Sequence, residues 1–175
     1  MRKIIRIAIT GPESTAKSTL AEALAHYFDG IFYPEYAREY FQDHSTQYTY
    51  NDLEEITKKQ IEQYHESANS AAKLVFFDTW LIITKVWFQW AYQTEPDWLE
   101  EKIADLPIDL YLLCVPDIAW EPDPLREHGG EERLQLFDAY KSELQQRKLK
   151  FVEINGIGEQ RVQNAIKAVK SLLHS

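Results

Sequence analysis

Short apolar runs alternate with amphipathic stretches along this chain. The stretches carry apolar residues at the three- and four-residue spacing of helices. Strands that alternate with helices predict an α/β fold, here a five-stranded parallel sheet covered by helices on both faces. The five runs that read as strands are 4–10, 31–34, 73–78, 109–115 and 150–154.

Two of the predicted helices have features of their own. For the longest one, Asn51 is the expected N-cap, with Glu54 three residues later in the capping-box position. The helix over 79–93 is unusually aromatic, and its Trp87 and Trp90 share a face, so one of them could stack on a planar ring. The expected helices are 18–28, a brief one over 36–44, 52–72, 79–93, 97–105, 131–148 and a last one that carries Val162, Ile166, Val169 and Leu173 on one face.

Length and composition narrow the class of protein. A chain of 175 residues predicts one domain over 1–175 with a substantial core. The net charge of −9 argues against nucleic acid as the main partner, because phosphate backbones are bound by an excess of Lys and Arg. No secretory signal and no stretch of ~20 apolar residues is found, so we expect a soluble cytoplasmic protein without a membrane partner. Cys114 lies in an apolar run and is expected in the core, and the five histidines show no metal spacing.

A phosphate-binding loop is the strongest chemical signal. The pattern of Gly, four residues, Gly, Lys and Ser or Thr is met by Gly11, Lys17 and Ser18, between a predicted strand and a predicted helix, whereas Ala16 stands at the second glycine. If that position needs a positive φ, alanine costs about 1–2 kcal/mol, which is a tolerable strain. Backbone N–H groups would surround a triphosphate, Lys17 would reach the β- and γ-phosphates, and Ser18 would complete a Mg²⁺ shell. The predicted ATP-binding residues are Gly11, Glu13, Ser14, Thr15, Ala16, Lys17, Ser18 and Thr19.

Acidic residues follow the second and third predicted strands. Glu35 comes directly after the second strand, and Arg38 lies one helical turn further on. A carboxylate at this sheet edge could accept the proton of a hydroxyl that attacks a γ-phosphate. Asp78 ends the third strand, where it could anchor Mg²⁺ or substrate, and it could also cap the next helix.

The segment 116–132 is polar and contains Pro and Gly. A polar loop that carries Arg126 after the fourth strand fits a lid that closes over the phosphates. For Arg133, at the start of the next helix, an ordinary solvated position is equally compatible with the sequence.

Four segments together resemble the ribosylnicotinamide kinase domain of NadR-type proteins: "GPESTAKSTL", "PEYAREY", "FFDTW" and "WEPDPLR". The resemblance runs over roughly residues 4–155. It implies a nucleoside-kinase-like P-loop fold with a lid and ATP-dependent phosphorylation of nicotinamide riboside to nicotinamide mononucleotide. The portions that larger NadR-type proteins use for nucleotidyl transfer and DNA binding have no counterpart here, so the domain is expected to act alone.

The resemblance also implies roles for individual residues. Lys17 and Ser18 match the phosphate and Mg²⁺ residues, and Asp78 matches the first acid of a "DTD" motif. The sequence departs from the family pattern at Ala16, at Trp80, which replaces the second acid, and at Pro34, which replaces an aromatic residue. The implied substrate-binding residues are Glu35, Tyr36, Arg38, Asp78 and Trp120, with Arg126 in the lid segment.

The sequence therefore predicts a small-molecule kinase that uses ATP and Mg²⁺ on a small nucleoside acceptor. Lys17, Glu35, Asp78 and Arg126 are the predicted catalytic residues, with Glu35 preferred over Asp78 as the base. Two alternatives stay open, a nucleotide-binding or regulatory NTPase module with weak or lost kinase activity, and a kinase of another nucleoside. The oligomeric state is not predicted.

Overall fold

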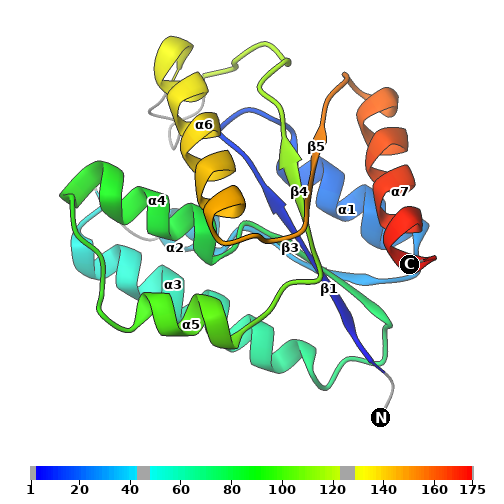
Figure 1. The fold of residues 1–175 in the computed structure, drawn as a ribbon, viewed down its shortest axis with the longest axis horizontal. Helices are drawn as coiled ribbons and strands as arrows, with labels where there is room; N and C mark the ends of the chain where they lie inside the picture. Colours follow the sequence, from blue (N-terminus) through cyan, green and yellow to red (C-terminus); the bar gives the residue numbers. More distant parts are fainter. Residues whose placement is uncertain (1–2, 43–47, 123–128, 175) are drawn as a thin grey trace.

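The computed structural model describes residues 3–42, 48–122 and 129–174. Within these ranges the five predicted strands form one parallel sheet in the order β2-β3-β1-β4-β5 (Figure 1). The predicted fold class is therefore confirmed. The strands are β1 (Ile5–Thr10), β2 (Ile31–Tyr33), β3 (Leu74–Asp78), β4 (Leu110–Cys114) and β5 (Phe151–Ile154).

Helices cover both faces of the sheet. Side chains alternate between the faces along each strand, so Ile7 and Ile9 join one apolar cluster while Ala8 joins the other. Helices α1 and α7 pack on the first face, and α3, α4, α5 and α6 lie on the second (Figure 1). The helices are α1 (Lys17–Tyr27), α2 (Tyr36–Gln42), α3 (Tyr50–Ser67), α4 (Leu81–Tyr92), α5 (Leu99–Asp105), α6 (Gly130–Gln146) and α7 (Glu159–Leu173).

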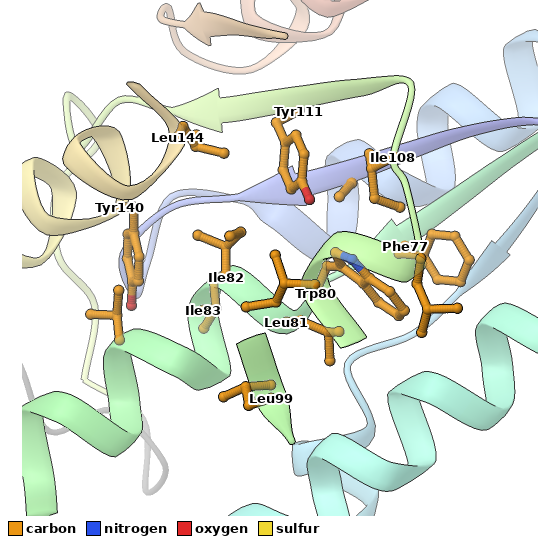
Figure 2. Close-up of a cluster of buried hydrophobic side chains, with 14 of the residues drawn as sticks. Phe77, Trp80, Leu81, Ile82, Ile83, Leu99, Ile108, Tyr111, Tyr140 and Leu144 are labelled. Carbon is orange, nitrogen blue, oxygen red and sulfur yellow. The ribbon is translucent and has the colours of Figure 1, made fainter. Parts of the chain in front are cut away.

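Trp80 belongs to the core of the second face. It is 1% exposed and packs against Phe77, with 5.1 Å between ring centroids (Figure 2). Its other ring neighbour is Tyr64, on which it stacks at 5.4 Å. Large buried rings of this kind contribute strongly to core stability. The position where the family pattern carries a second acid is therefore used here for packing, directly before α4 begins.

The start of α3 differs from the prediction. The capping box is formed by Thr49 and Asp52, since the Thr49 N–H donates to Asp52 Oδ2 (2.7 Å) and the Asp52 N–H donates to Thr49 Oγ1 (3.3 Å). The predicted cap at Asn51 was wrong by two residues. Both boxes are possible locally, and packing decides between them, because Tyr50 on the first turn packs against Phe88 of α4, 4.9 Å between centroids. The helix also ends at Ser67 rather than near residue 72.

Two other expectations concern Cys114 and membrane-spanning helices. Cys114 is fully buried, as predicted. Within the described part of the chain, every helix is too short or too polar to cross a membrane.

Candidate functional site

The loop between β1 and α1 has the backbone that a phosphate-binding loop requires. Gly11 has a φ of 146°, and a Cβ there would lie 2.8 Å from the Cys114 carbonyl oxygen, so only glycine fits. Ala16 has φ 60° and ψ 31°, in the left-handed region, and Ser14 has φ 55°. The positive φ anticipated for position 16 is therefore present with alanine in place. Two left-handed residues other than glycine in one short loop mark stored strain.

The loop leaves donors available at the start of α1. No side chain caps this helix, and the Leu20 N–H makes the first bond back to the Ala16 carbonyl (3.0 Å). The N–H groups of Lys17, Ser18 and Thr19 therefore lie ahead of the helical ladder, at the positive end of the helix dipole. This arrangement favours an anion.

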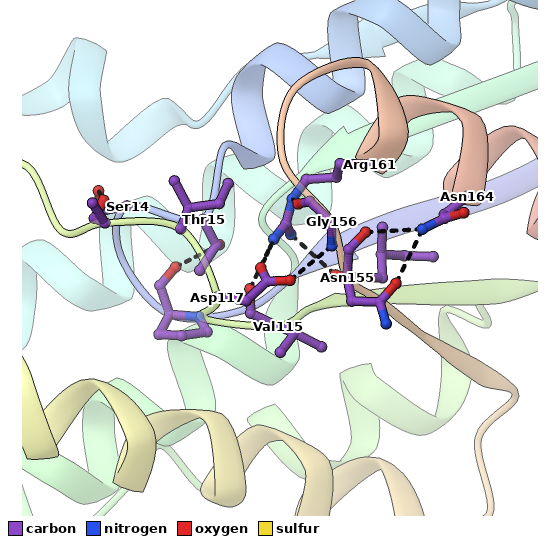
Figure 3. A network of polar contacts seen from close by, with 12 residues as sticks. Ser14, Thr15, Val115, Asp117, Asn155, Gly156, Arg161 and Asn164 are labelled. Carbon is purple, nitrogen blue, oxygen red and sulfur yellow. Dashed lines mark hydrogen bonds and ion pairs between the residues drawn. The ribbon is translucent and has the colours of Figure 1, made fainter.

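Side chains hold the loop closed on itself. The Thr15 hydroxyl donates to the Pro12 carbonyl at 2.8 Å (Figure 3), and Lys17 Nζ donates to the same oxygen at 2.9 Å. On the outer side, the Ser14 hydroxyl accepts from the Glu121 N–H at 3.1 Å. The phosphate loop, residues 11–19, is thus tied to the segment that follows β4.

A buried arginine ties together the loops that follow β4 and β5. Arg161 is 2% exposed and donates to the carbonyls of Val115 (3.0 Å), Ile154 (3.0 Å) and Gly156 (2.8 Å) (Figure 3). It also pairs with Asp117, whose other carboxylate oxygen accepts from the Gly156 N–H at 2.7 Å. These bonds fix the edge of the sheet where parallel strands present their functional loops.

A cavity of about 360 Å³ opens beside the phosphate loop. Its size is that of a small-molecule site. Residues of the phosphate loop form one side. The other lining residues, which we name the facing wall, are Glu35, Ala37, Arg38, Phe41, Tyr48, Thr79, Ile83, Trp87 and Tyr140.

Glu35 and Arg38 form an ion pair on the facing wall. Arg38 Nε lies 3.0 Å from Glu35 Oε2, and the two side chains are 40% and 15% exposed. At this exposure the pair adds little stability, but it orients the carboxylate within the cavity.

Asp78 lies at the end of β3 and is 2% exposed. Neither of its carboxylate oxygens has a hydrogen bond of normal geometry within the described residues, although the Ser18 hydroxyl acts on Asp78 as a side-chain donor. The hydroxyls of Thr10 and Thr79 also lack partners among the described residues. Burial, and then the charge of Glu35, raise the pKa of Asp78 to about 6, against smaller lowering effects of Lys17, Ser18 and Arg38. An ionisable group with a raised pKa beside a cavity is typical of a functional site.

These orphaned polar atoms fit a hydrated Mg²⁺ ion. Buried polar atoms that lack protein partners are normally satisfied by water or an ion. Mg²⁺ prefers hydroxyl and carboxylate oxygens, keeps several waters and takes few protein ligands. Ser18 and Asp78 supply that donor set. The described residues hold no group of three His, Cys, Asp or Glu side chains that could bind a metal ion alone.

The structure brings most of the predicted site residues together. The phosphate-loop residues, Glu35 and Arg38 line one cavity. Tyr36 is not among the lining residues and packs against Tyr40, with 6.1 Å between centroids. Trp120 lies outside the cavity, 37% exposed, with its ring over Gly129.

Two other predictions concern the lid and the aromatic helix. Arg126 lies outside the described residues, as does the middle of 116–132, so the lid stays a prediction. Of the tryptophans that share a face of α4, Trp87 lines the cavity, whereas Trp90 is absent from its lining and 38% exposed.

Sequence reasoning missed several residues of the site. Tyr48 stacks on Trp87, with centroids 6.2 Å apart and an interplanar angle of 14°, and Tyr140 reaches the cavity from α6. Arg133 was left open as a solvated residue, yet it is 6% exposed. A signal for Arg133 was present in the sequence, because it stands in the buried row of α6 with Leu136, Tyr140 and Leu144.

Residues 6–161 match a protein family described as an AAA domain. The chain belongs to this family. It is also 26% identical over 153 residues to the "Trifunctional NAD biosynthesis/regulator protein NadR" of Escherichia coli K12, and 27% identical to its Salmonella typhimurium counterpart. The match covers 85% of this chain and 37% of those relatives, so the chain spans less than half of their length. The resemblance to NadR-type proteins is thereby confirmed.

Solved structures agree with this family. A NadR protein in complex with NR superposes with a TM-score of 0.80, and one with NAD and AMP-PNP with 0.77. Both are 26% identical and cover 98% of this chain and 50% of their own. A deoxyadenosine kinase from M. mycoides, 13% identical with a TM-score of 0.68, shares the fold. The P-loop kinase fold of the AAA-domain protein is therefore established.

Proposed function

We propose that this protein is an ATP-dependent kinase that phosphorylates a hydroxyl of a nucleoside, with nicotinamide riboside as the acceptor. The observation that carries the proposal is that one cavity joins the phosphate loop to the facing wall, which holds a carboxylate and stacking aromatic rings. Similarity to NadR, including a NadR structure in complex with NR, supports the choice of acceptor.

On the donor side, the phosphate loop binds the triphosphate through its free N–H groups. Lys17 Nζ exchanges the Pro12 carbonyl for the β- and γ-phosphates, where its charge stabilises the transferred group. Ser18 and Asp78 would hold Mg²⁺, which would supply positive charge to offset that of the triphosphate. The identity of position 16 does not prevent this role, because Ala16 already adopts the left-handed backbone of the loop.

On the acceptor side, the facing wall offers flat apolar surface and one carboxylate. The parallel rings of Tyr48 and Trp87 provide π faces for a planar base, and a cationic nicotinamide ring gains further from them. Glu35, held by Arg38, accepts the proton of the attacking hydroxyl. Glu35 is preferred over Asp78 as this base because Glu35 lines the cavity, whereas Asp78 is buried and is not a lining residue.

The test is a phosphorylation assay with ATP and Mg²⁺ that compares nicotinamide riboside with a panel of nucleosides. Lys17→Ala should lower turnover about a hundredfold or more, because it removes a charge that acts on the transferred phosphoryl group. Glu35→Gln should lower kcat by a similar factor. Lys58→Ala is the matched control, since Lys58 lies on α3 in an exposed pair with Glu55.

The outcomes separate the proposal from its rivals. Turnover of nicotinamide riboside that depends on Lys17 supports it. Turnover of another nucleoside alone would change the acceptor and keep the kinase. Slow ATP hydrolysis with no phosphorylated acceptor would favour a regulatory NTPase, and full activity of Lys17→Ala would contradict the mechanism.

A further inference from the structure

Arg133 connects helix α6 to the phosphate loop. Its side chain, 6% exposed, comes from the first turn of α6. Nε donates to the Glu13 carbonyl at 3.0 Å, and Nη2 donates to the Ser14 carbonyl at 2.6 Å. Nη1 donates to the Ile118 carbonyl, in the segment after β4, at 2.7 Å. One planar guanidinium thus holds two successive carbonyls of the phosphate loop against the neighbouring segment.

These bonds set the direction of the loop's peptide groups. In a trans peptide the C=O and the following N–H point in opposite directions. When the carbonyls of Glu13 and Ser14 are turned toward Arg133, the N–H groups of Ser14 and Thr15 are turned away from it. Arg133 therefore orients donors of the anion cradle without being one of the cavity-lining residues.

The same bonds lie where the loop is strained. Ser14 and Ala16 both have positive φ, of 55° and 60°. Such a backbone persists only where its surroundings over-determine it. A glycine at position 16 would adopt this conformation without a steric cost, whereas alanine does not.

We propose that Arg133 is a positioning residue that keeps the phosphate loop in its anion-binding conformation and compensates for alanine at position 16. The inference rests on the proposed function in one respect, namely that the loop binds a nucleoside triphosphate. It predicts that the importance of Arg133 depends on which residue occupies position 16.

The experiment is a double-mutant cycle on the full chain, read out as the Kd of AMP-PNP with Mg²⁺ by titration calorimetry. Arg133→Met should weaken binding about tenfold, because carbonyls of the loop lose a charged donor. In the Ala16→Gly background the same change should weaken binding only about threefold, since glycine tolerates the conformation unaided. Arg147→Met is the matched control, because Arg147 caps the far end of α6 and should leave binding within twofold.

Kinetics supply a second readout. Arg133→Lys keeps a charge but loses the planar fork, so it should raise the KM for ATP a fewfold and leave kcat within twofold. If Arg133→Met fails to fold, the KM for ATP of Arg133→Lys still tests the positioning role. A residue that only stabilises the fold would lower the unfolding temperature without raising the KM for ATP.

Equal weakening by Arg133→Met in both backgrounds would overturn the compensation, and unchanged binding would overturn the positioning role. Calorimetry of AMP-PNP binding needs no acceptor. A protein that binds AMP-PNP but phosphorylates no acceptor would refute the proposed kinase activity, and the double-mutant cycle would still decide the role of Arg133. Absence of AMP-PNP binding by the unmodified protein would overturn both.

Discussion

The two sides of the cavity are built in different ways. The phosphate loop is one run of nine residues, 11–19, which carries internal bonds to Pro12 and is braced by Arg133 of α6. The facing wall comes from Glu35 and α2, from Tyr48 before α3, from Thr79 between β3 and α4, from α4 and from α6. Residues as distant as Glu35 and Tyr140 meet there only because the chain folds.

This difference separates phosphate binding, which many proteins share, from selection of one acceptor. Backbone N–H groups at a helix start recognise any phosphate, so a short local sequence suffices. Selection of one acceptor requires side chains of definite shape and charge around it, and several elements must supply them. We therefore expect changes in the phosphate loop to act on the nucleotide and changes in the facing wall to act on the acceptor.

Asp78 is near residues of both sides, because Lys17 and Glu35 both affect its pKa, and its replacement should have the largest effect on the comparison. Asp78→Asn removes the carboxylate that we propose holds Mg²⁺, so turnover should fall about a hundredfold with either substrate saturating. In the unmodified protein without bound metal, burial raises the pKa of Asp78 to about 6, so Mg²⁺ must displace a proton there, and the Mg²⁺ concentration for half-maximal turnover should rise as pH falls below about 6. This rise should be absent from the variant. Turnover measured against Mg²⁺ concentration between pH 5 and 8 checks both statements.

The same variant should be more stable than the unmodified protein at neutral pH. The folded-state pKa of Asp78 is raised, so ionisation disfavours the folded state, and stability is lost as pH rises from about 4 through about 6. Asparagine does not ionise, so Asp78→Asn does not lose this stability as pH rises. Urea unfolding without Mg²⁺ should show a gain of about 3 kcal/mol at pH 8 that vanishes below pH 4. A gain of equal size at both pH values would contradict this cause.

Trp87 tests the facing wall alone. Trp87→Leu keeps an apolar residue but removes the π face, so the KM for the acceptor should rise about tenfold while the KM for ATP stays within twofold. Trp90→Leu, one turn further along α4 and outside the cavity lining, is the control. Equal changes in both KM values would show that the two sides of the cavity are not separable.

The smallest expected effect concerns Ala16 in the phosphate loop. Ala16→Gly should stabilise the protein by about 0.5 kcal/mol, because relief of the left-handed strain exceeds the entropy that glycine adds to the unfolded chain. Ala23→Gly, in the interior of α1, should destabilise it by about 1 kcal/mol. Thermal unfolding of the two variants gives the comparison, and a shift of the same sign in both would show that Ala16 carries no backbone strain.

Individual residues show how far prediction from the sequence extends. The five strands and the loop from Gly11 to Lys17 were anticipated, because apolar runs and a compact motif are local signals. The start of α3 was missed by two residues, since Thr49 and Asn51 are both good caps and the packing of Tyr50 on α4 selects the first. The sequence did not single out Tyr48 and Tyr140 as site residues, because an aromatic residue in a cavity wall has the same sequence pattern as one in the core.

The sequence by itself determined the α/β class, the phosphate loop and the acids at the ends of β2 and β3, because each depends on residues close together in the chain. The tertiary structure decided that Trp80 is core, that Trp87 rather than Trp90 faces the cavity, and that Arg133 braces the phosphate loop from 120 residues away. Burial, hydrogen bonding and the raised pKa of Asp78 depend on neighbours brought in by folding. Local sequence patterns therefore specify phosphate binding and the acidic residues of the site. Long-range packing specifies which side chains line the cavity and how buried the acidic residues are.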